Sequence, residues 1–206
     1  MRYIKTLSNM KKVYQIITIG LISLLCISAS KLSADPIDFL SVGKIIEFNK
    51  ESFELKWSSH PSENYYKQEY LRKDDKFPKF KKMIMVEAVE GEISGNQAAE
   101  GKITELENWK KKNPIVKYQK IENKEKNEVL LDFILTDGKS IYEWNIYRYQ
   151  NQKSKSGNYL VLYSYSHRGY ITNKEEEAKF FDSVKEIKAD LINKVNAISL
   201  PNVKTK

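Results

Sequence analysis

Cysteine and histidine are scarce in this sequence. Among its 206 residues there is one cysteine, Cys26, and there are two histidines, His60 and His167. A zinc site takes three or four ligands, most of them cysteine or histidine, and the two histidines lie far apart in the chain. A single cysteine cannot form a disulfide within one chain. We therefore expect no metal, no cofactor and no internal disulfide.

Motifs for covalent catalysis are missing as well. No Gly-x-Ser-x-Gly elbow occurs in the chain. Ser164 and Ser166 are close to His167 in sequence, but neighbouring residues of a strand point to opposite faces. Carboxylate pairs for a glycosidase can be drawn from Glu87, Glu90, Glu92, Asp132 and Glu143. Most sequences of this composition supply such pairs, so we expect no catalytic residue, with an unrecognised hydrolase as the alternative.

The first 34 residues have the three regions of a secretory signal peptide. The basic start contains no acidic residue and holds Arg2, Lys5, Lys11 and Lys12. An apolar run over residues 13–27 follows, and small and polar residues lead to Ser33-Ala34. The run is shorter than the roughly 20 residues that a transmembrane helix needs. We expect an exported protein, periplasmic or secreted, cut after Ala34, with cleavage nearer Ala29 or Ser30 as the competing site.

Cys26 raises a second alternative for the leader. An acylated cysteine of a lipoprotein follows a short apolar motif, and Leu24-Leu25 precedes Cys26. The residue just before such a cysteine should be small, however, and Leu25 is large. We expect Cys26 to leave with the signal peptide, with lipidation as the competing outcome.

Most of the net positive charge, five of the eight units, belongs to the leader. It holds five of the 35 basic residues and none of the 27 acidic ones, so 30 basic residues against 27 acidic ones remain. A mildly basic exported domain gives little reason to expect nucleic acid as a partner. Residues 35–206 are enough for one domain that buries roughly 70% of its surface. The expected organisation is therefore a signal peptide over residues 1–34 and a single domain over residues 35–206.

Two helices are predicted. Ser94 with Gln97 forms a capping box, apolar residues follow at three- and four-residue steps, and Asn113-Pro114 ends the first helix. The second helix begins at a capping box of Thr172 with Glu175 or of Asn173 with Glu176, and Pro201 ends it. Its apolar stripe comprises Ala178, Phe181, Val184, Ile187, Leu191, Val195 and Ile198. Such a stripe predicts a helix that lies along a sheet.

Eight strands are predicted around these helices. They cover residues 45–48, 53–57, 65–71, 83–89, 116–121, 129–135, 141–149 and 159–166. Asp137-Gly138 is a hairpin turn signal between the sixth and seventh strands, and residues 150–158 read as a polar loop. Successive hairpins with intervening helices predict an α+β fold, an antiparallel sheet with helices packed on it.

The order of these elements resembles a known family. The resemblance is carried by Leu131-Asp132-Phe133, the Asp137-Gly138 turn, the strand from Tyr142 to Tyr147, the strand from Tyr159 to Tyr163, and Phe180-Phe181-Asp182-Ser183-Val184. Strands, a helix, three meandering strands and a closing amphipathic helix resemble the Mog1/PsbP-like fold. The resemblance implies an αβα sandwich and a non-enzymatic role in assembly, since most members are assembly, chaperone or accessory proteins.

Tyrosine is the unusual residue of the predicted sheet. Tyr147 and Tyr149 alternate on one strand, as Tyr163 and Tyr165 do on the next, and residues two apart share a face. Aromatic residues on both faces indicate a sheet covered on both sides. Tyrosine also forms strands well and packs through its ring. The alternatives are therefore packing and a binding face, and these four tyrosines are candidate interface residues.

A basic segment with two phenylalanines is the other candidate interface. Phe77 and Phe80 are interleaved with Lys79, Lys81 and Lys82. A solvated loop is one interpretation. The other is a docking loop whose phenylalanines anchor an acidic partner protein.

These features together predict an exported, non-enzymatic protein-binding or assembly protein. Its partner would be another exported protein or a filament assembly. One concrete hypothesis is a spirochaete flagellar-coiling sheath protein, a periplasmic coat component of the flagellar filament that affects filament shape and motility. A periplasmic or secreted hydrolase and a carrier of a small apolar ligand are the alternatives.

Overall fold

The structure is a computed structural model that describes residues 35–154 and 157–204. The predicted signal peptide, with Cys26, lies outside the described residues. Eight strands and two helices follow one another in the described chain. They are β1 (Ile45–Phe48), β2 (Glu51–Ser62), β3 (Tyr65–Arg72), β4 (Lys82–Glu90), α2 (Gly95–Lys110), β5 (Lys117–Asn123), β6 (Glu128–Thr136), β7 (Ile141–Ser154), β8 (Gly157–Tyr170) and α3 (Lys174–Ala197).

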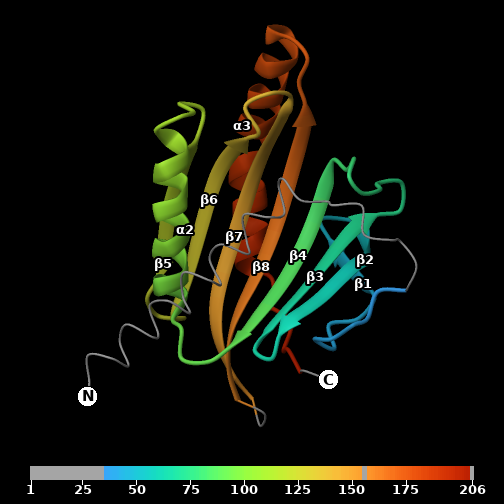
Figure 1. The fold of residues 1–206 in the computed structure, drawn as a ribbon, viewed down its shortest axis with the longest axis vertical. Helices are drawn as coiled ribbons and strands as arrows, with labels where there is room; N and C mark the ends of the chain where they lie inside the picture. Colours follow the sequence, from blue (N-terminus) through green and yellow to red (C-terminus); the bar gives the residue numbers. More distant parts are fainter. Residues whose placement is uncertain (1–34, 155–156, 205–206) are drawn as a thin grey trace.

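All eight strands join one antiparallel sheet, in the order β1-β2-β3-β4-β8-β7-β6-β5. The first four strands are sequential hairpins, and the last four form a second meander that runs back toward the middle of the sheet (Figure 1). The connection through α2 carries the chain from β4 in the centre to β5 at the far edge. The two meanders meet where β4 pairs with β8. The predicted α+β class and antiparallel sheet are confirmed.

Short turns connect the strands of the second meander. The β6–β7 turn agrees with the prediction, and the β7–β8 connection does not. At the β6–β7 turn, Gly138 has a φ of 74°, and Asp137 Oδ1 accepts hydrogen bonds from three successive backbone N–H groups. These donors, which offset its partial burial, lower the pKa of Asp137. Residues 150–158 were expected to form a polar loop, and that prediction is wrong, because β7 and β8 continue their pairing as far as Ser154 and Gly157. The polar side chains of residues 150–154 and 157–158 therefore belong to paired strands.

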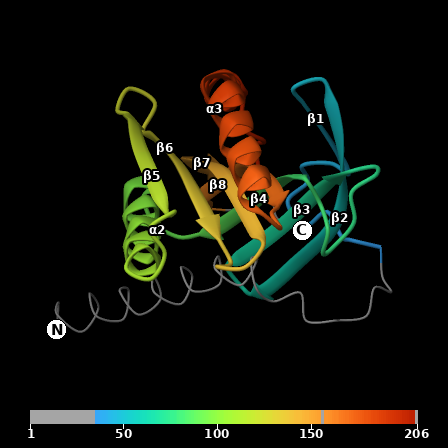
Figure 2. The same cartoon turned by 90° about the horizontal axis from the view of Figure 1, so that it is seen from above.

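The two helices lie on opposite faces of the sheet (Figure 2). α2 contacts β5, β6 and β7, and α3 contacts β7 and β8. The Ser94–Gln97 capping box is present, and Asn173 caps α3 by accepting from the Glu176 backbone N–H at 2.9 Å. Gly95 begins α2 where a side chain would press on Tyr149, with an added Cβ 3.2 Å from the tyrosine Cβ. No helix in the described ranges is long and apolar enough to cross a membrane.

Each helix closes a separate apolar core. The core under α3 is centred on β4, β7 and β8 and includes Trp144, which is fully buried. The core under α2 contains Leu106 of the helix and Phe133 of β6. The buried α3 residues are Phe180, Val184, Leu191 and Val195. The predicted stripe is therefore correct in its second half, whereas Ala178 is exposed and Phe180 is more deeply buried than Phe181. Gly169 of β8 makes room for the Phe180 ring, which lies 2.6 Å from where a Cβ would stand.

Candidate binding surfaces

The four candidate tyrosines lie inside the molecule. Tyr147 and Tyr149 belong to the core under α2, and Tyr163 and Tyr165 to the core under α3. None of the four is more than 8% exposed. The prediction that they form an accessible binding face is wrong, because a helix covers each face of the sheet. The prediction that both faces are covered is confirmed.

Phe80 is a core residue as well. It is 2% exposed and packs with Leu71 and Met83, and the Arg168 guanidinium carbon lies 3.8 Å from its ring centre. Phe77 is half-buried and meets Phe80 edge to face, with ring centres 5.8 Å apart. The hypothesis that both phenylalanines anchor a partner is therefore wrong for Phe80. Phe77 remains partly accessible.

The segment between β3 and β4 is held by hydrogen bonds to buried groups. The buried Asp75 carboxylate accepts from Arg72 Nε at 2.8 Å and from the Lys81 backbone N–H at 3.1 Å. The Tyr170 hydroxyl accepts from the Phe80 backbone N–H at 3.0 Å. The loop is thus held at its base by β3, through Arg72, and by β8, through Tyr170.

Lysines surround this fixed base. Lys79 and Lys81 are exposed as predicted, and Lys73 and Lys76 are exposed beside them. Lys82 differs, because its ammonium lies 2.6 Å from a Glu51 carboxylate oxygen and its side chain is about three-quarters buried. We call the four exposed lysines the lysine loop. They flank the half-buried Phe77 in the sequence, together with one exposed acid, Asp74.

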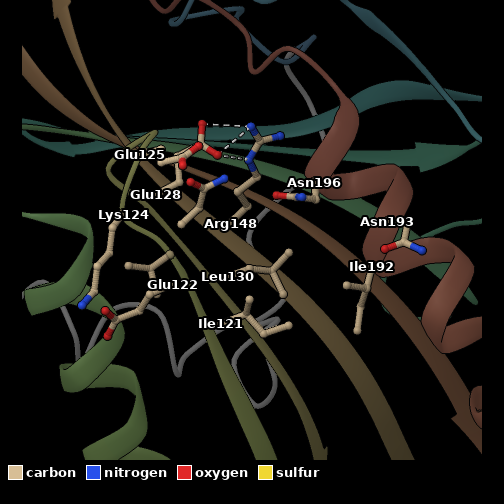
Figure 3. A pocket seen from close by; sticks show the side chains of 12 residues that line it. Ile121, Glu122, Lys124, Glu125, Glu128, Leu130, Arg148, Ile192, Asn193 and Asn196 are labelled. Atoms are coloured by element: carbon tan, nitrogen blue, oxygen red, sulfur yellow. Dashed lines mark hydrogen bonds and ion pairs between the residues drawn. The ribbon is translucent and has the colours of Figure 1, made fainter.

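A groove lies between α3 and the β5–β6 hairpin, on the face opposite α2. Its volume is about 480 Å³. Figure 3 shows Ile121 and Leu130 of the sheet facing Ile192 of α3, with Asn193 and Asn196 along the helix side. The groove therefore combines an apolar floor with amide groups that can both donate and accept hydrogen bonds.

A buried ion pair closes one end of this groove (Figure 3). Arg148 Nη2 donates to both carboxylate oxygens of Glu128, at 2.9 and 3.0 Å, and Arg148 Nη1 donates to the Val195 and Ile198 carbonyls at 2.7 Å each. The arginine thereby binds carbonyls at the end of α3, which are left unpaired by the helix itself. Its donors are already engaged, so its role is to fix α3 on the sheet.

Three of the five candidate acids, Glu87, Asp132 and Glu143, are buried and lie in ion pairs. Glu143 accepts from Arg168 Nε at 2.6 Å, and Asp132 lies 2.6 Å from the Lys188 ammonium on the other face of the sheet. Lys67 lies 3.0 Å from Glu69 and 3.5 Å from Glu87. Burial alone would lower the pKa of Lys67, but the two carboxylates outweigh burial and raise it.

The two histidines are kept apart from these groups. His167 stacks on Phe180 in the α3 core, with ring centres 5.7 Å apart, whereas Ser164 and Ser166 point to the α2 side. His60 stacks on Tyr66 at 4.1 Å. Across residues 35–154 and 157–204, no three histidine, cysteine or acidic side chains gather as metal ligands.

Comparison with known proteins places the fold in a family. A family model matches residues 40–200. The chain belongs to this family. The matched residues include every strand and both helices, so the sheet with its two helices is the part of the chain that the family shares. The searches of curated proteins and of solved structures gave no match.

Sequence reasoning did not find the groove. Its apolar residues come from three predicted elements, β5, β6 and α3. Because α3 is far from β5 and β6 in the chain, their contact cannot be predicted from local patterns. One signal was present: Arg148 is a lone positive charge inside an apolar strand, and such a residue is rarely buried without a partner. Ile121 was another, as an apolar residue in a strand of otherwise polar neighbours.

Proposed function

We propose that this chain is an exported, non-enzymatic protein-binding or assembly protein whose lysine loop docks on an acidic partner protein. The observation that supports this best is the loop itself. Residues 72–82 hold six basic and two acidic residues, and four lysines remain exposed around Phe77 after the internal ion pairs are formed.

The fixed base of the loop favours binding. Ordering a flexible loop on association costs free energy, so a loop that is already held loses less when its partner arrives. The hydrogen bonds to Asp75 and Tyr170 supply that order in the free protein. Exposed lysines chiefly raise the rate of encounter with an acidic surface, and a half-buried ring such as Phe77 supplies contact area.

The finer parts of the proposal concern family and location. The sheet with one helix on each face is compatible with the Mog1/PsbP-like αβα sandwich, which we retain as the proposed fold type. We also retain export to the periplasm or beyond, with the leader over residues 1–34, as well as the hypothesis of a sheath component of a flagellar filament. These proposals predict a partner on the outer side of the cytoplasmic membrane.

The test is a charge reversal on the loop. Lys73, Lys76, Lys79 and Lys81 are changed together to glutamate, and the protein is used to capture partners from the cell-envelope fraction of its native organism. We expect mass spectrometry to recover a partner with the parent protein and at least about tenfold less of it with the variant. The difference should shrink at high salt, because exposed charges are screened.

A matched control carries the same change in net charge elsewhere. It reverses Lys111, Lys112, Lys124 and Lys126, which are also exposed. Recovery with this control should stay near that of the parent. Equal recovery with the loop variant, or equal losses with the two variants, would contradict docking through the lysine loop.

The groove beside α3 favours a second candidate, the carrier of a small apolar ligand. Its apolar floor and its amide groups are typical of sites for such molecules. The loop variant separates the two candidates, since a ligand in the groove is unaffected by charge reversal at residues 73–81.

A further inference from the structure

The β5 strand forms one edge of the sheet. Among the described strands it pairs only with β6, so alternate backbone N–H and C=O groups of β5 face outward. The opposite edge is β1, which is only four residues long. β5 has seven residues, and its fifth residue, Ile121, is 40% exposed. An exposed edge of this length is a template for another strand.

The sequence of β5 is complementary to itself when it is reversed. If two β5 strands pair around a two-fold axis perpendicular to the sheet, the axis must lie between one residue and its own copy. The reason is that directly paired residues point to the same face of the sheet, whereas neighbours along a strand point to opposite faces. With the axis at Ile121, the isoleucines of two copies oppose each other. Lys120 of each copy then opposes Glu122 of the other, and Gln119 opposes Asn123.

Other axes are worse. Centring the pair on Lys120 sets two lysines face to face, and centring it on Glu122 sets two glutamates face to face. Like charges directly opposite are destabilising in a sheet, whereas opposite charges and apolar pairs are stabilising. The Ile121 register also brings Lys117 of one copy near Glu125 of the other. Of these three registers, only the one centred on Ile121 sets opposite charges directly against each other.

Helix α2 packs on one face of the sheet beside this edge. Lys102 of α2 lies over the rings of Phe133 in β6 and Tyr147 in β7, at 5.6 and 5.7 Å, and Lys110 lies over the ring of Tyr118 in β5, at 5.8 Å. The helix therefore covers one face of β5, and the pairing uses the outer backbone edge of the strand. Within one copy, Lys120 lies 2.7 Å from both Glu100 and Glu122. Across the two-fold axis, Lys120 would also meet Glu122 of the second copy.

We propose that two copies of this chain associate through antiparallel pairing of their β5 strands, centred on Ile121. The pairing satisfies the free backbone groups of both edges and covers the exposed isoleucines. It joins two eight-stranded sheets into one, and it places the two grooves beside α3 on the same face of the joined sheet. It does not depend on the lysine loop, which lies between β3 and β4.

The mass of the purified exported protein tests the pairing. Sedimentation equilibrium should show a dimer that dissociates on dilution. Ile121→Lys should raise the Kd at least about tenfold, because it opposes two ammonium groups on the axis. A parent protein that stays monomeric up to about 1 mM, where an association is worth only about 4 kcal/mol, would overturn the proposal. So would a dimer that Ile121→Lys leaves unchanged.

A charge exchange fixes the register. Lys120→Glu alone opposes glutamate to Glu122, and Glu122→Lys alone opposes lysine to Lys120, so each variant should be mainly monomeric. Mixed one to one, the two variants should form a heterodimer, because every pair across the axis is again opposite in sign. Monomers in the mixture, with both variants folded by circular dichroism, would exclude this register.

A cysteine placed on the axis gives an independent check. Directly opposite residues of antiparallel strands lie close enough for a disulfide. Ile121→Cys should therefore be cross-linked into dimers by mild oxidation, whereas Asn123→Cys, which opposes Gln119 of the other copy, should not. The parent protein, oxidised in the same way, gives the background. Equal cross-linking of the two variants would contradict the pairing.

Discussion

At the scale of single residues, tyrosine and histidine are used for packing. Tyr70 is fully buried, and its hydroxyl donates to the Gly43 carbonyl at 3.0 Å. Burial raises the pKa of Tyr163 and of Tyr165, so both stay neutral in the α3 core. A large ring with one polar atom at its tip suits a sheet covered on both faces. The same property made tyrosine a misleading signal for an interface.

His167 makes the stability of the protein depend on pH. Burial, followed by Lys82 and Arg72, lowers the pKa of His167 from about 6.5 to about 4. Between pH 6.5 and pH 4 the imidazole is protonated in the unfolded chain but not in the folded chain. The free energy of unfolding is therefore highest above pH 6.5 and decreases as the pH falls to about 4. At about 1.4 kcal/mol per pH unit, the loss is about 3 kcal/mol.

Replacing this histidine isolates its contribution. His167→Phe keeps an aromatic ring against Phe180, and the difference in unfolding free energy between variant and parent should grow by about 3 kcal/mol from pH 7.5 to pH 4. Urea titrations at a series of pH values measure it. His60→Ala, at the exposed histidine, controls for the loss of one imidazole. A difference that stays constant with pH would contradict a neutral His167.

At the scale of elements, local signals were sufficient for most of the fold. The Ser94 cap, the Asp137-Gly138 turn and the short apolar runs in β4, β6 and β8 each act through neighbours in the chain. The order of strands depends on contacts far apart in sequence, and only the hairpins were predictable. The groove beside α3 and the placement of Phe80 depend on such contacts as well, so neither could be read from periodicity.

The loop between β3 and β4 contains two phenylalanines with different roles. Phe80 is buried against Leu71 and Met83, so Phe80→Ala should lower the unfolding free energy by about 3–5 kcal/mol. Phe77 is half-buried, so Phe77→Ala should cost about 1 kcal/mol. Urea denaturation of the two variants compares them directly. Equal small losses would mean that Phe80 is not a core residue.

At the scale of the whole molecule, the proposed binding surfaces lie on different halves of the sheet. The lysine loop lies between β3 and β4, whereas the groove and the β5 edge belong to the other half of the sheet. A partner on the loop and a second copy on the β5 edge therefore contact different halves. If both proposals hold, a dimer presents two lysine loops, and a polymeric partner such as a filament can be held at two points with greater avidity than one loop gives.

The proposed partner lies outside the cytoplasm, so the proposal requires export. The predicted signal peptide leads to a prediction about the mature N-terminus. Its basic start, apolar run and small-residue exit predict a mature N-terminus between Ser30 and Asp35. Intact-mass measurement of the protein recovered from the envelope or the medium determines it. Cys26→Ala should leave that mass unchanged, because the cysteine is removed with the leader. A mature chain that begins at an acylated Cys26, with processing lost in Cys26→Ala, would instead establish a lipoprotein. The lysine loop would then act from a membrane surface, which would restrict its partners to those within reach of that membrane.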